Sequence, residues 1–476
     1  MKNYNKKSPE SIEQFAKELT GKSLSEVRDL SELSSNKKNK GRLGQLIEEY
    51  YFKNVLNSDR EADFKEAGVE LKVTGVKKIK PRKKSKSLAK QKGLSVKERL
   101  VLSVINYNEV ADEDWSDNSL FKKIKNLLLM FYLYEREIPV VDREFILSSL
   151  WDPDEDDLEV IKEDWNKIVG KIKNGEAHNL SEGDTMYLGA CVKGSSSETV
   201  RDQPYSSIDA KQRAFCYKRS YMDSVFEELY SNRESKTSSI KEKNKTIEES
   251  LNSLFEPFIG KTAHKIEKEL GCNLENKSKQ YYNRLSYLIL GNNSEDEIDE
   301  FKKAGVKIKT MRLDGGGKPT EDMSFPAFKF KDIVEEEWDT STLKNRLENS
   351  KYFFTVFRML DITNSDFKKL SNEEKKKHIK LDKILLWNMP MSDIENYAKD
   401  VWEKTKSILK EDKLKIETRA GRRHTNFPKS RQNKVLFVRT HARDSKDTYP
   451  LPHGGEYTKQ SFWLHRSYLM TQIEDN

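Results

Sequence analysis

The chain of 476 residues is long enough for two or three domains with separate cores, and hydrophobic and charged residues each make up 35% of it. Its net charge of +8 fits a polyanionic partner, because basic side chains on phosphates release counterions, although a lysine-rich protein without such a partner would have the same charge. No apolar run approaches the roughly 18 residues of a membrane span, and the three cysteines lack disulfide spacing, which argues against membrane and disulfide-rich secreted proteins.

Helices and strands alternate along the first half of the chain. Apolar spacing predicts an amphipathic helix at residues 9–20 and a second helix at 44–52. A strand follows at 69–73, where period two puts Glu70 and Lys72 on one face. Further strands are expected at 99–107 and 126–134, and further helices around Trp165 and over 208–229. This alternation predicts an α/β fold in which a mixed sheet is covered by helices.

The second half of the chain repeats the first at an offset of 237 to 239 residues. The segment 63–72, D-F-K-E-A-G-V-E-L-K, returns at 300–309 as E-F-K-K-A-G-V-K-I-K. Other matches in the same order join Gly21-Lys22-Ser23 to Gly260-Lys261-Thr262, and Trp165 to Trp402. A period of half the chain indicates a duplicated domain rather than a solenoid. We therefore predict domains at 1–230 and 251–476, joined by a polar linker at 231–250.

The two Gly-Lys-Ser/Thr segments are not phosphate-binding loops. A Walker loop needs a glycine five residues before the second glycine, and Ala16 and Phe255 occupy those places. Turns between helices are the simpler interpretation.

The repeated segment contains a candidate catalytic set in its first copy only. Glu70 and Lys72 share a strand face about 7 Å apart, and Asp63 precedes them across a glycine-containing turn. Two carboxylates are suitable ligands for Mg²⁺, and the lysine could orient the attacking water or stabilise charge on phosphorus. Glu-x-Lys alone is weak, because Glu373 and Glu411 begin the same pattern on what we expect to be solvated helix faces. The second copy keeps the apolar and glycine positions but has Lys307 in place of Glu70.

On these residues the first half resembles the MutH family of the PD-(D/E)xK nuclease superfamily, whose core reads D-F-x-x-x-G-V-E-L-K. The whole chain is similar to the staphylococcal type of GATC-cutting type II restriction endonuclease, with further matches at 97–102, 178–183 and 211–215. The resemblance implies two tandem restriction-endonuclease-like domains that form a pseudo-dimer.

The resemblance also implies roles for individual residues. Asp63 and Glu70 would hold Mg²⁺ and Lys72 would be the catalytic lysine. Glu48 would be an additional active-site acid, although it also suits an exposed helix face. Lys123 would be a supporting lysine, with its neighbour Lys125 as the alternative.

Candidate DNA contacts follow from the same comparison. They lie in two regions of the first half and one of the second: Lys193, Lys211, Arg213, Arg439, His441 and Arg443. Arginine suits bidentate reading of guanine. The family's reading arginine and aromatic residue fall near Cys191 and near Cys216 or Tyr217, so the first half departs from the family there.

Two basic segments stand apart from these candidates. Nine of the sixteen residues from 77 to 92 are Lys or Arg, which would suit either a DNA-clamping loop or a solvated hairpin tip. A second basic stretch, R-A-G-R-R-H-T-N, begins at Arg419.

Taken together, the sequence predicts a cytoplasmic, Mg²⁺-dependent endonuclease that cuts double-stranded DNA, with GATC as the site implied by the family. Its second half would bind DNA without cutting, either on the same site or on a second copy of it. A second chain on the DNA and a cognate DNA methyltransferase are the expected partners. The alternatives are a mismatch-repair nickase and a catalytically inactive DNA-binding protein.

Overall fold

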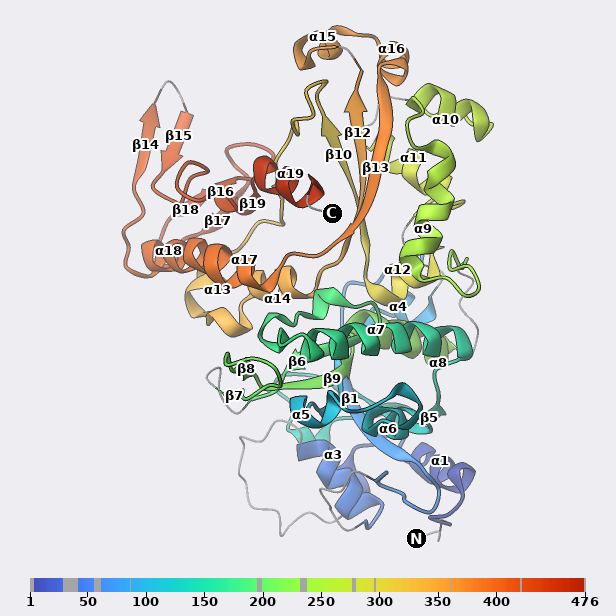
Figure 1. The fold of residues 1–476 in the computed structure, drawn as a ribbon. Helices are drawn as coiled ribbons and strands as arrows, with labels where there is room; N and C mark the ends of the chain where they lie inside the picture. Colours follow the sequence, from blue (N-terminus) through green and yellow to red (C-terminus); the bar gives the residue numbers. More distant parts are fainter. Residues whose placement is uncertain are drawn as a thin grey trace. The chain divides into compact units, whose positions relative to one another are not determined.

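The computed structural model describes residues 4–28, 42–54, 61–85, 87–194, 199–231, 238–275, 280–294, 297–360, 362–419 and 422–474. The chain forms two compact units, the first of residues 1–237 with 302–305 and the second of residues 238–301 with 306–476 (Figure 1). The predicted linker at 231–250 is therefore structured from residue 238 onward, while 232–237 lie outside the described residues. Among the described residues, no helix has the length and apolarity needed to cross a membrane.

The first unit contains a four-stranded sheet of order β2-β1-β4-β5, in which β1 is parallel to β4 and antiparallel to β2. A second sheet has the order β3-β9-β6. The elements of this unit are α1 (Pro9–Lys17), α2 (Leu24–Val27), α3 (Arg42–Leu46), the π-helix η1 (Ile47–Tyr51), β1 (Glu70–Lys78), α4 (Leu88–Gln91), β2 (Leu94–Val96), β3 (Leu100–Val104), α5 (Tyr107–Val110), α6 (Ser119–Ile124), β4 (Leu127–Tyr134), β5 (Phe145–Trp151), α7 (Glu155–Lys173), β6 (Leu188–Val192), β7 (Val200–Arg201), β8 (Ala210–Lys211), β9 (Arg213–Tyr217) and α8 (Arg219–Ser231).

The core of the first unit holds the central strands in place. The first six residues of β4 are buried, as expected for a strand covered on both faces. One hydrophobic cluster joins α1, α3 and η1 to β1 and β4, and it includes stacked rings of Phe15 and Tyr51. The start of β1 is thus fixed against two helices.

One predicted helix is wrong in its first part. Residues 208–229 were expected to be helical, but 210–211 and 213–217 form strands β8 and β9, and helix α8 begins only at Arg219. The short run R-A-F-C-Y is the fully buried middle strand of its sheet. A short buried run has no polar face, so its periodicity does not separate strand from helix.

The second unit has two sheets, β10-β12-β13 and β11-β19-β16, whose orders match β1-β4-β5 and β3-β9-β6 of the first unit, and no described strand takes the place of β2. In Figure 1, helices α9 and α11 lie along one side of the first of these sheets. The elements are α9 (Ile247–Phe255), α10 (Ala263–Glu269), α11 (Tyr281–Ile289), α12 (Asp299–Ala304), β10 (Lys307–Leu313), β11 (Met323–Ser324), α13 (Phe330–Glu335), α14 (Thr342–Asn349), β12 (Tyr352–Met359), α15 (Asn364–Lys369), α16 (Asn372–Lys377), β13 (Ile379–Trp387), α17 (Met391–Asp393), the π-helix η9 (Ile394–Ala398), α18 (Lys399–Lys410), β14 (Ile416–Arg419), β15 (Arg422–Thr425), β16 (Leu436–Thr440), β17 (Thr448–Pro450), β18 (Glu456–Thr458), β19 (Gln460–Leu464) and α19 (Arg466–Glu474).

Several contacts recur in both units at corresponding residues. Gly21, with φ 79°, donates its N–H to Phe145, and Gly260, with φ 80°, donates its N–H to Leu381, each at 2.7 Å. These glycines lie in turns before α2 and α10, in agreement with the rejection of a phosphate loop.

Two side-chain contacts recur in the same way. The rings of Trp115 and Trp165 are 5.7 Å apart, and those of Trp338 and Trp402 are 5.6 Å apart. A buried tyrosine hydroxyl donates to an aspartate in each unit, from Tyr221 to Asp157 and from Tyr468 to Asp393. Corresponding positions can therefore be compared residue by residue.

Candidate active site

A tight turn brings Asp63 next to the start of β1. Phe64 and Val69 form an antiparallel bridge, and Gly68 closes the turn with φ 64°, a conformation that glycine adopts without strain. The Asp63 side chain then accepts a hydrogen bond from the backbone N–H of Leu71 at 2.8 Å. Asp63 and Glu70 thus lie on the same end of the strand, as the sequence predicted.

Glu70 is the first residue of β1 and is only 3% exposed. Its backbone N–H donates to Asn126, just before β4, and the parallel register pairs Glu70 with Leu127. Lys72 Nζ donates to Glu70 Oε1 at 2.6 Å. The other carboxylate oxygen, Oε2, is buried and has no hydrogen-bond partner among the described residues. An orphaned carboxylate oxygen is costly unless a ligand completes the site.

Glu48 extends toward this carboxylate pair from the π-helix η1. Burial raises the pKa of Glu48 to about 7, and the negative charges of Asp63 and Glu70 add to this shift while Lys72 opposes it. Burial and the charge of Glu70 also raise the pKa of Asp63. Burial is the largest cause of both pKa shifts, and the neighbouring carboxylates add to it although Lys72 opposes it in both.

The structure separates the two lysine candidates of helix α6 and the turn after it. Lys123 Nζ lies 3.9 Å from Glu70 Oε1. Lys125 is exposed and lies over the ring of Phe121, 4.1 Å from its centroid. Lys123 is therefore the lysine of the carboxylate cluster, and Lys125 is not.

These residues fit a divalent cation with oxygen ligands. Glu70 Oε2 has no hydrogen-bond partner among the described residues, and the negative charges of Asp63 and Glu70 act on the Glu48 carboxylate. Among the described residues, no group of three or more His, Cys, Asp or Glu is arranged to hold an ion on its own. An ion here would take two carboxylates and complete its shell with water and phosphate, as Mg²⁺ commonly does.

The candidate DNA contacts of the first unit differ in exposure. Lys193, just after β6, is exposed, and its backbone N–H donates to Gln212. Lys211 is partly buried in β8. Arg213 is 1% exposed, and its guanidinium donates to the backbone carbonyl of Ala190. Because an enclosed guanidinium does not face DNA, we assign Arg213 a structural role and keep only the two lysines as candidates.

The second unit keeps only one of the three acids of this cluster, at the place of Asp63, and has lost the other two. Register pairs Lys307 with Tyr352 as it pairs Glu70 with Leu127, so Lys307 replaces Glu70. Helices α6 and α14 match from their N-caps, Asn118 and Ser341, which puts Arg346 at the place of Lys123. Residues 284–289 repeat the R-L-x-x-L-I pattern of 42–47, which puts the buried Leu290 at the place of Glu48.

Glu300, which replaces Asp63, is still acidic but serves another purpose. It is 4% exposed, and its carboxylate accepts hydrogen bonds from the Ser239 hydroxyl and from the backbone N–H groups of Ile240 and Lys241. This carboxylate is therefore occupied in anchoring the segment that begins the second unit.

The candidate DNA contacts of the second unit are exposed at the ends of β16 and β19. The Arg439 guanidinium lies over Trp463, 5.2 Å from the ring centroid, and His441 is 5.6 Å from the same ring. Arg439 is also 3.8 Å from Asp322, and these residues line a pocket with His465 and Arg466. The third candidate, Arg443, is 87% exposed.

Trp463 was missed by sequence analysis. Register places Arg439 and Trp463 where the first unit has Cys191 and Cys216, both buried. The family's arginine is predicted to fall near Cys191 and its aromatic residue near Cys216 or Tyr217, and the second unit has Arg439 and Trp463 at the places of Cys191 and Cys216. Counting strand register in the second half would have found Trp463.

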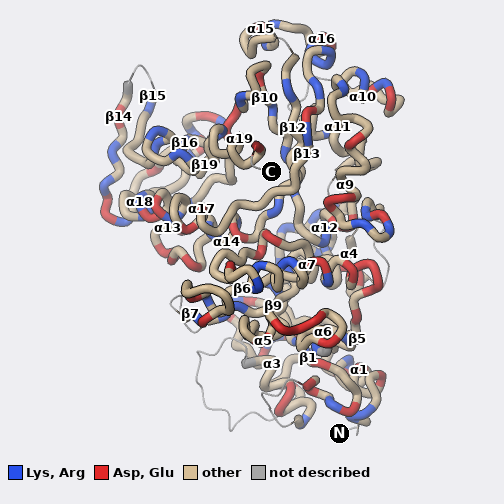
Figure 2. The backbone as a smooth tube through the Cα atoms, in the orientation of Figure 1, with Lys and Arg blue, Asp and Glu red and all other residues tan. Residues whose placement is uncertain are grey.

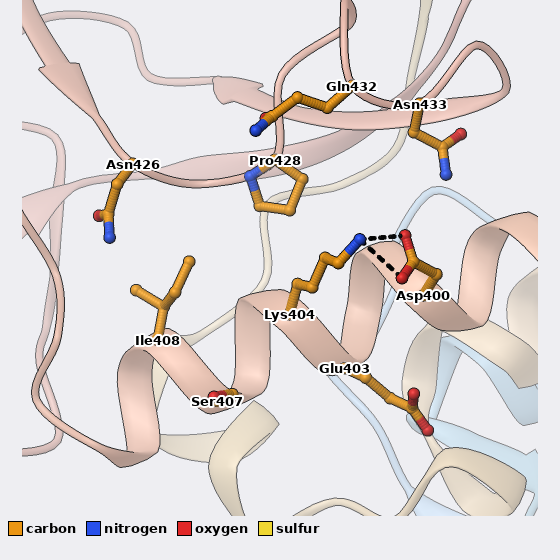
Figure 3. Close-up of a pocket in the computed structure, with 9 residues that line it drawn as sticks. All are labelled: Asp400, Glu403, Lys404, Ser407, Ile408, Asn426, Pro428, Gln432 and Asn433. Atoms are coloured by element: carbon orange, nitrogen blue, oxygen red, sulfur yellow. Dashed lines mark hydrogen bonds and ion pairs between the residues drawn. The ribbon is translucent and has the colours of Figure 1, made fainter.

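A separate pocket lies between α18 and residues 426–433 of the second unit (Figure 3). Its charged residues are Asp400, Glu403 and Lys404, and Lys404 is paired with Asp400 at 2.8 Å. This lining is more acidic than basic, so it does not suit a phosphate. None of the predicted site residues lines it.

Comparisons with known proteins agree with these observations. The family described as DNA mismatch repair enzyme MutH matches residues 52–164, which include Asp63, Glu70, Lys72 and Lys123. The chain is 32% identical to the type II restriction enzyme Sau3AI of Staphylococcus aureus, over 98% of each chain. It is 27% identical to the DNA mismatch repair protein MutH of Shewanella woodyi over 40% of this chain and 80% of that protein, and 25% identical to that of Vibrio campbellii over 36% and 72%.

Proposed function

Because the chain belongs to the family of MutH-like type II restriction endonucleases, as its full-length similarity to Sau3AI shows, we propose that its first unit cuts DNA and its second unit binds DNA without cutting. The protein is a sequence-specific restriction endonuclease, a site-specific deoxyribonuclease. The site it recognises is proposed to be GATC, Mg²⁺ its cofactor and the cytoplasm its location.

The observation that carries this proposal is the cluster around Glu70. Asp63 and Glu70 would hold Mg²⁺, which supplies positive charge beside the scissile phosphate when bound. Lys72, whose Nζ is 2.6 Å from Glu70 Oε1, would orient the attacking water and stabilise the negative charge that grows on phosphorus. Lys123 adds a second cation, and Glu48 can hold or release a proton near neutral pH.

Several features of the second unit support a role in binding DNA rather than in cutting it. Its contacts and sheet orders match those of the first unit, which supports an origin by duplication and a pseudo-dimeric arrangement. Lys307 and Leu290 replace two acids of the active site, while Arg439, His441 and Trp463 form an exposed surface suited to base edges. The unit would hold a second copy of the recognition site, or the same one.

Each chain then has one complete active site, whereas cutting a palindrome needs two. We therefore propose that two chains meet on DNA, and that a cognate methyltransferase protects the host genome.

Plasmid digestion tests this function. With Mg²⁺ the purified protein should give linear fragments whose sequenced ends begin at GATC, and with Ca²⁺ it should bind without cutting. Persistent open circles would instead indicate a nickase of the mismatch-repair type. Binding without cleavage in either ion would indicate an inactive DNA-binding protein, and ends without GATC would overturn the proposed site.

A further inference from the structure

The connection between the long helix and the next strand differs between the units. It runs from the end of α7 to β6 over residues 174–187, and from the end of α18 to β16 over residues 411–435. Trp165 and Trp402 mark the two helices as equivalent, and strand register marks β6 and β16 as equivalent. The second connection is therefore an enlarged version of the first, 25 residues long instead of 14.

The two connections also differ in charge. Residues 411–435 include eight Lys or Arg and three Asp or Glu, whereas 174–187 include three Asp or Glu and no Lys or Arg. The chain as a whole has a net charge of only +8. Strand β14 contains one acidic and one basic residue, Glu417 and Arg419, and β15 begins with Arg422 and Arg423 (Figure 2). This one connection thus contributes more than half of the net positive charge.

The added residues form a two-stranded antiparallel ribbon, β14 with β15, which we call the basic hairpin (416–425). Thr418 pairs with Arg423 and Glu417 with His424, and no third described strand joins the pair. Each of these four side chains is exposed, and Ile416 is 45% exposed. The side chains of Arg419 and Arg422 and the tip residues 420–421 lie outside the described residues.

The base of the basic hairpin is fixed to the second unit. The Asn426 side chain accepts from the backbone N–H of Lys415 and donates to the carbonyl of Lys413, both at 2.9 Å. The next residue, Phe427, is fully buried and stacks on Phe330. The chain then continues into β16, which ends at the Arg439 and Trp463 surface.

We propose that the basic hairpin enters a groove of double-stranded DNA and places Arg423, together with Lys413 and Lys415 at its base, on the flanking phosphates. A two-stranded ribbon fits the major groove, and basic side chains on phosphates supply most of the non-specific affinity. An anchored base reduces the entropy lost on binding. The inference deepens the proposed function and rests on it, since the second unit must bind DNA.

Binding of the full chain to a labelled GATC duplex in Ca²⁺, at several salt concentrations, tests this role. The hairpin variant is K413Q/K415Q/R423Q, which changes three exposed residues. The matched control is K368Q/K369Q/K377Q, which removes three exposed lysines of α15 and α16 in the same unit. The hairpin variant should lower the slope of log affinity against log salt by about 2 to 3 and weaken binding about tenfold or more near 0.15 M salt, and the control should not.

A third variant, R439A, separates the hairpin from the proposed function. If R439A weakens binding but the hairpin variant behaves like the control, the hairpin inference is wrong and the second unit still binds DNA. If R439A and the hairpin variant both bind like the wild type, the proposal that the second unit binds DNA is wrong. Weaker binding with an unchanged salt slope would overturn the phosphate contacts. Circular dichroism and melting should be unchanged, because Lys415 and Arg423 are exposed.

Discussion

Strands β1 and β10 begin in the same way and carry opposite charge. Each runs parallel to the next strand of its sheet in the same register, and each follows a glycine turn with φ between 64° and 69°. Yet Glu70 opens one strand and Lys307 the other, and Leu290 stands at the place of Glu48. The positive charge of Lys123 is kept by Arg346. The comparison teaches that the backbone geometry does not by itself create the proposed site, since the second unit has kept this geometry without two of the three acids.

The largest effect is expected for a substitution of Glu70, the residue that distinguishes β1 from β10. E70A removes a buried carboxylate that we assign to Mg²⁺, so cleavage should fall by about 10³-fold or more, in the range that loss of an electrostatic group costs. DNA binding in Ca²⁺ should remain within a few fold of the wild type. K307A at the equivalent place is the matched control and should leave the single-turnover cleavage rate nearly unchanged. Full activity in E70A would show that the assigned site is not the active site.

A smaller effect is expected at the two neighbouring lysines. K123A removes a cation 3.9 Å from Glu70 and should lower the single-turnover rate by about 10- to 100-fold, as a supporting charge does. K125A removes an exposed side chain that packs on Phe121 and should leave the rate within about twofold. Equal losses of cleavage rate in K123A and K125A would mean that a lysine's distance from Glu70 does not determine its contribution to catalysis.

The smallest effect concerns stability and the proton on Glu48. Its pKa is raised from 4.5 to about 7 in the folded protein, so folding takes up a proton between these values and stability falls as pH rises through that window. E48Q removes the buried charge. In EDTA at pH 8 the variant should melt a few degrees above the wild type, since about 1 kcal/mol moves Tm by about 2–4 °C for a unit of this size. Near pH 4 the difference should disappear, and a wild type more stable at pH 8 would contradict the assignment.

The sequence predicted the parts of the site that lie close together along the chain. Asp63, Glu70 and Lys72 span ten residues, and strand alternation is enough to place Glu70 and Lys72 on one face. It left Lys123 and Lys125 unresolved, because helix α6 ends at Ile124 and the chain turns between them. The burial of Arg213 could not be predicted either, since the sequence of a short strand does not show whether a basic residue faces solvent or the core.

The sequence likewise predicted the fold class and some of the strands but not all of them. The alternation of elements gave the mixed α/β class, and buried strand β4 was recognisable from its continuous apolar run. Strand β9 was mistaken for helix because it is short and buried throughout. The basic hairpin could not be foreseen as a ribbon, because its polar, exposed residues have neither the period of a strand nor a hydrophobic face.

The buried position of Glu300 has a consequence for the history of the chain. Its carboxylate closes the first turn of the second unit through three hydrogen bonds, so moving it to serve an ion would release that backbone. Restoring a glutamate at 307 would therefore not rebuild the cluster, since Leu290 would also have to change and Glu300 would have to be freed from its hydrogen bonds. Under the proposed division of labour, no single substitution would give the second unit the carboxylates of the first, because its one remaining acid now anchors backbone.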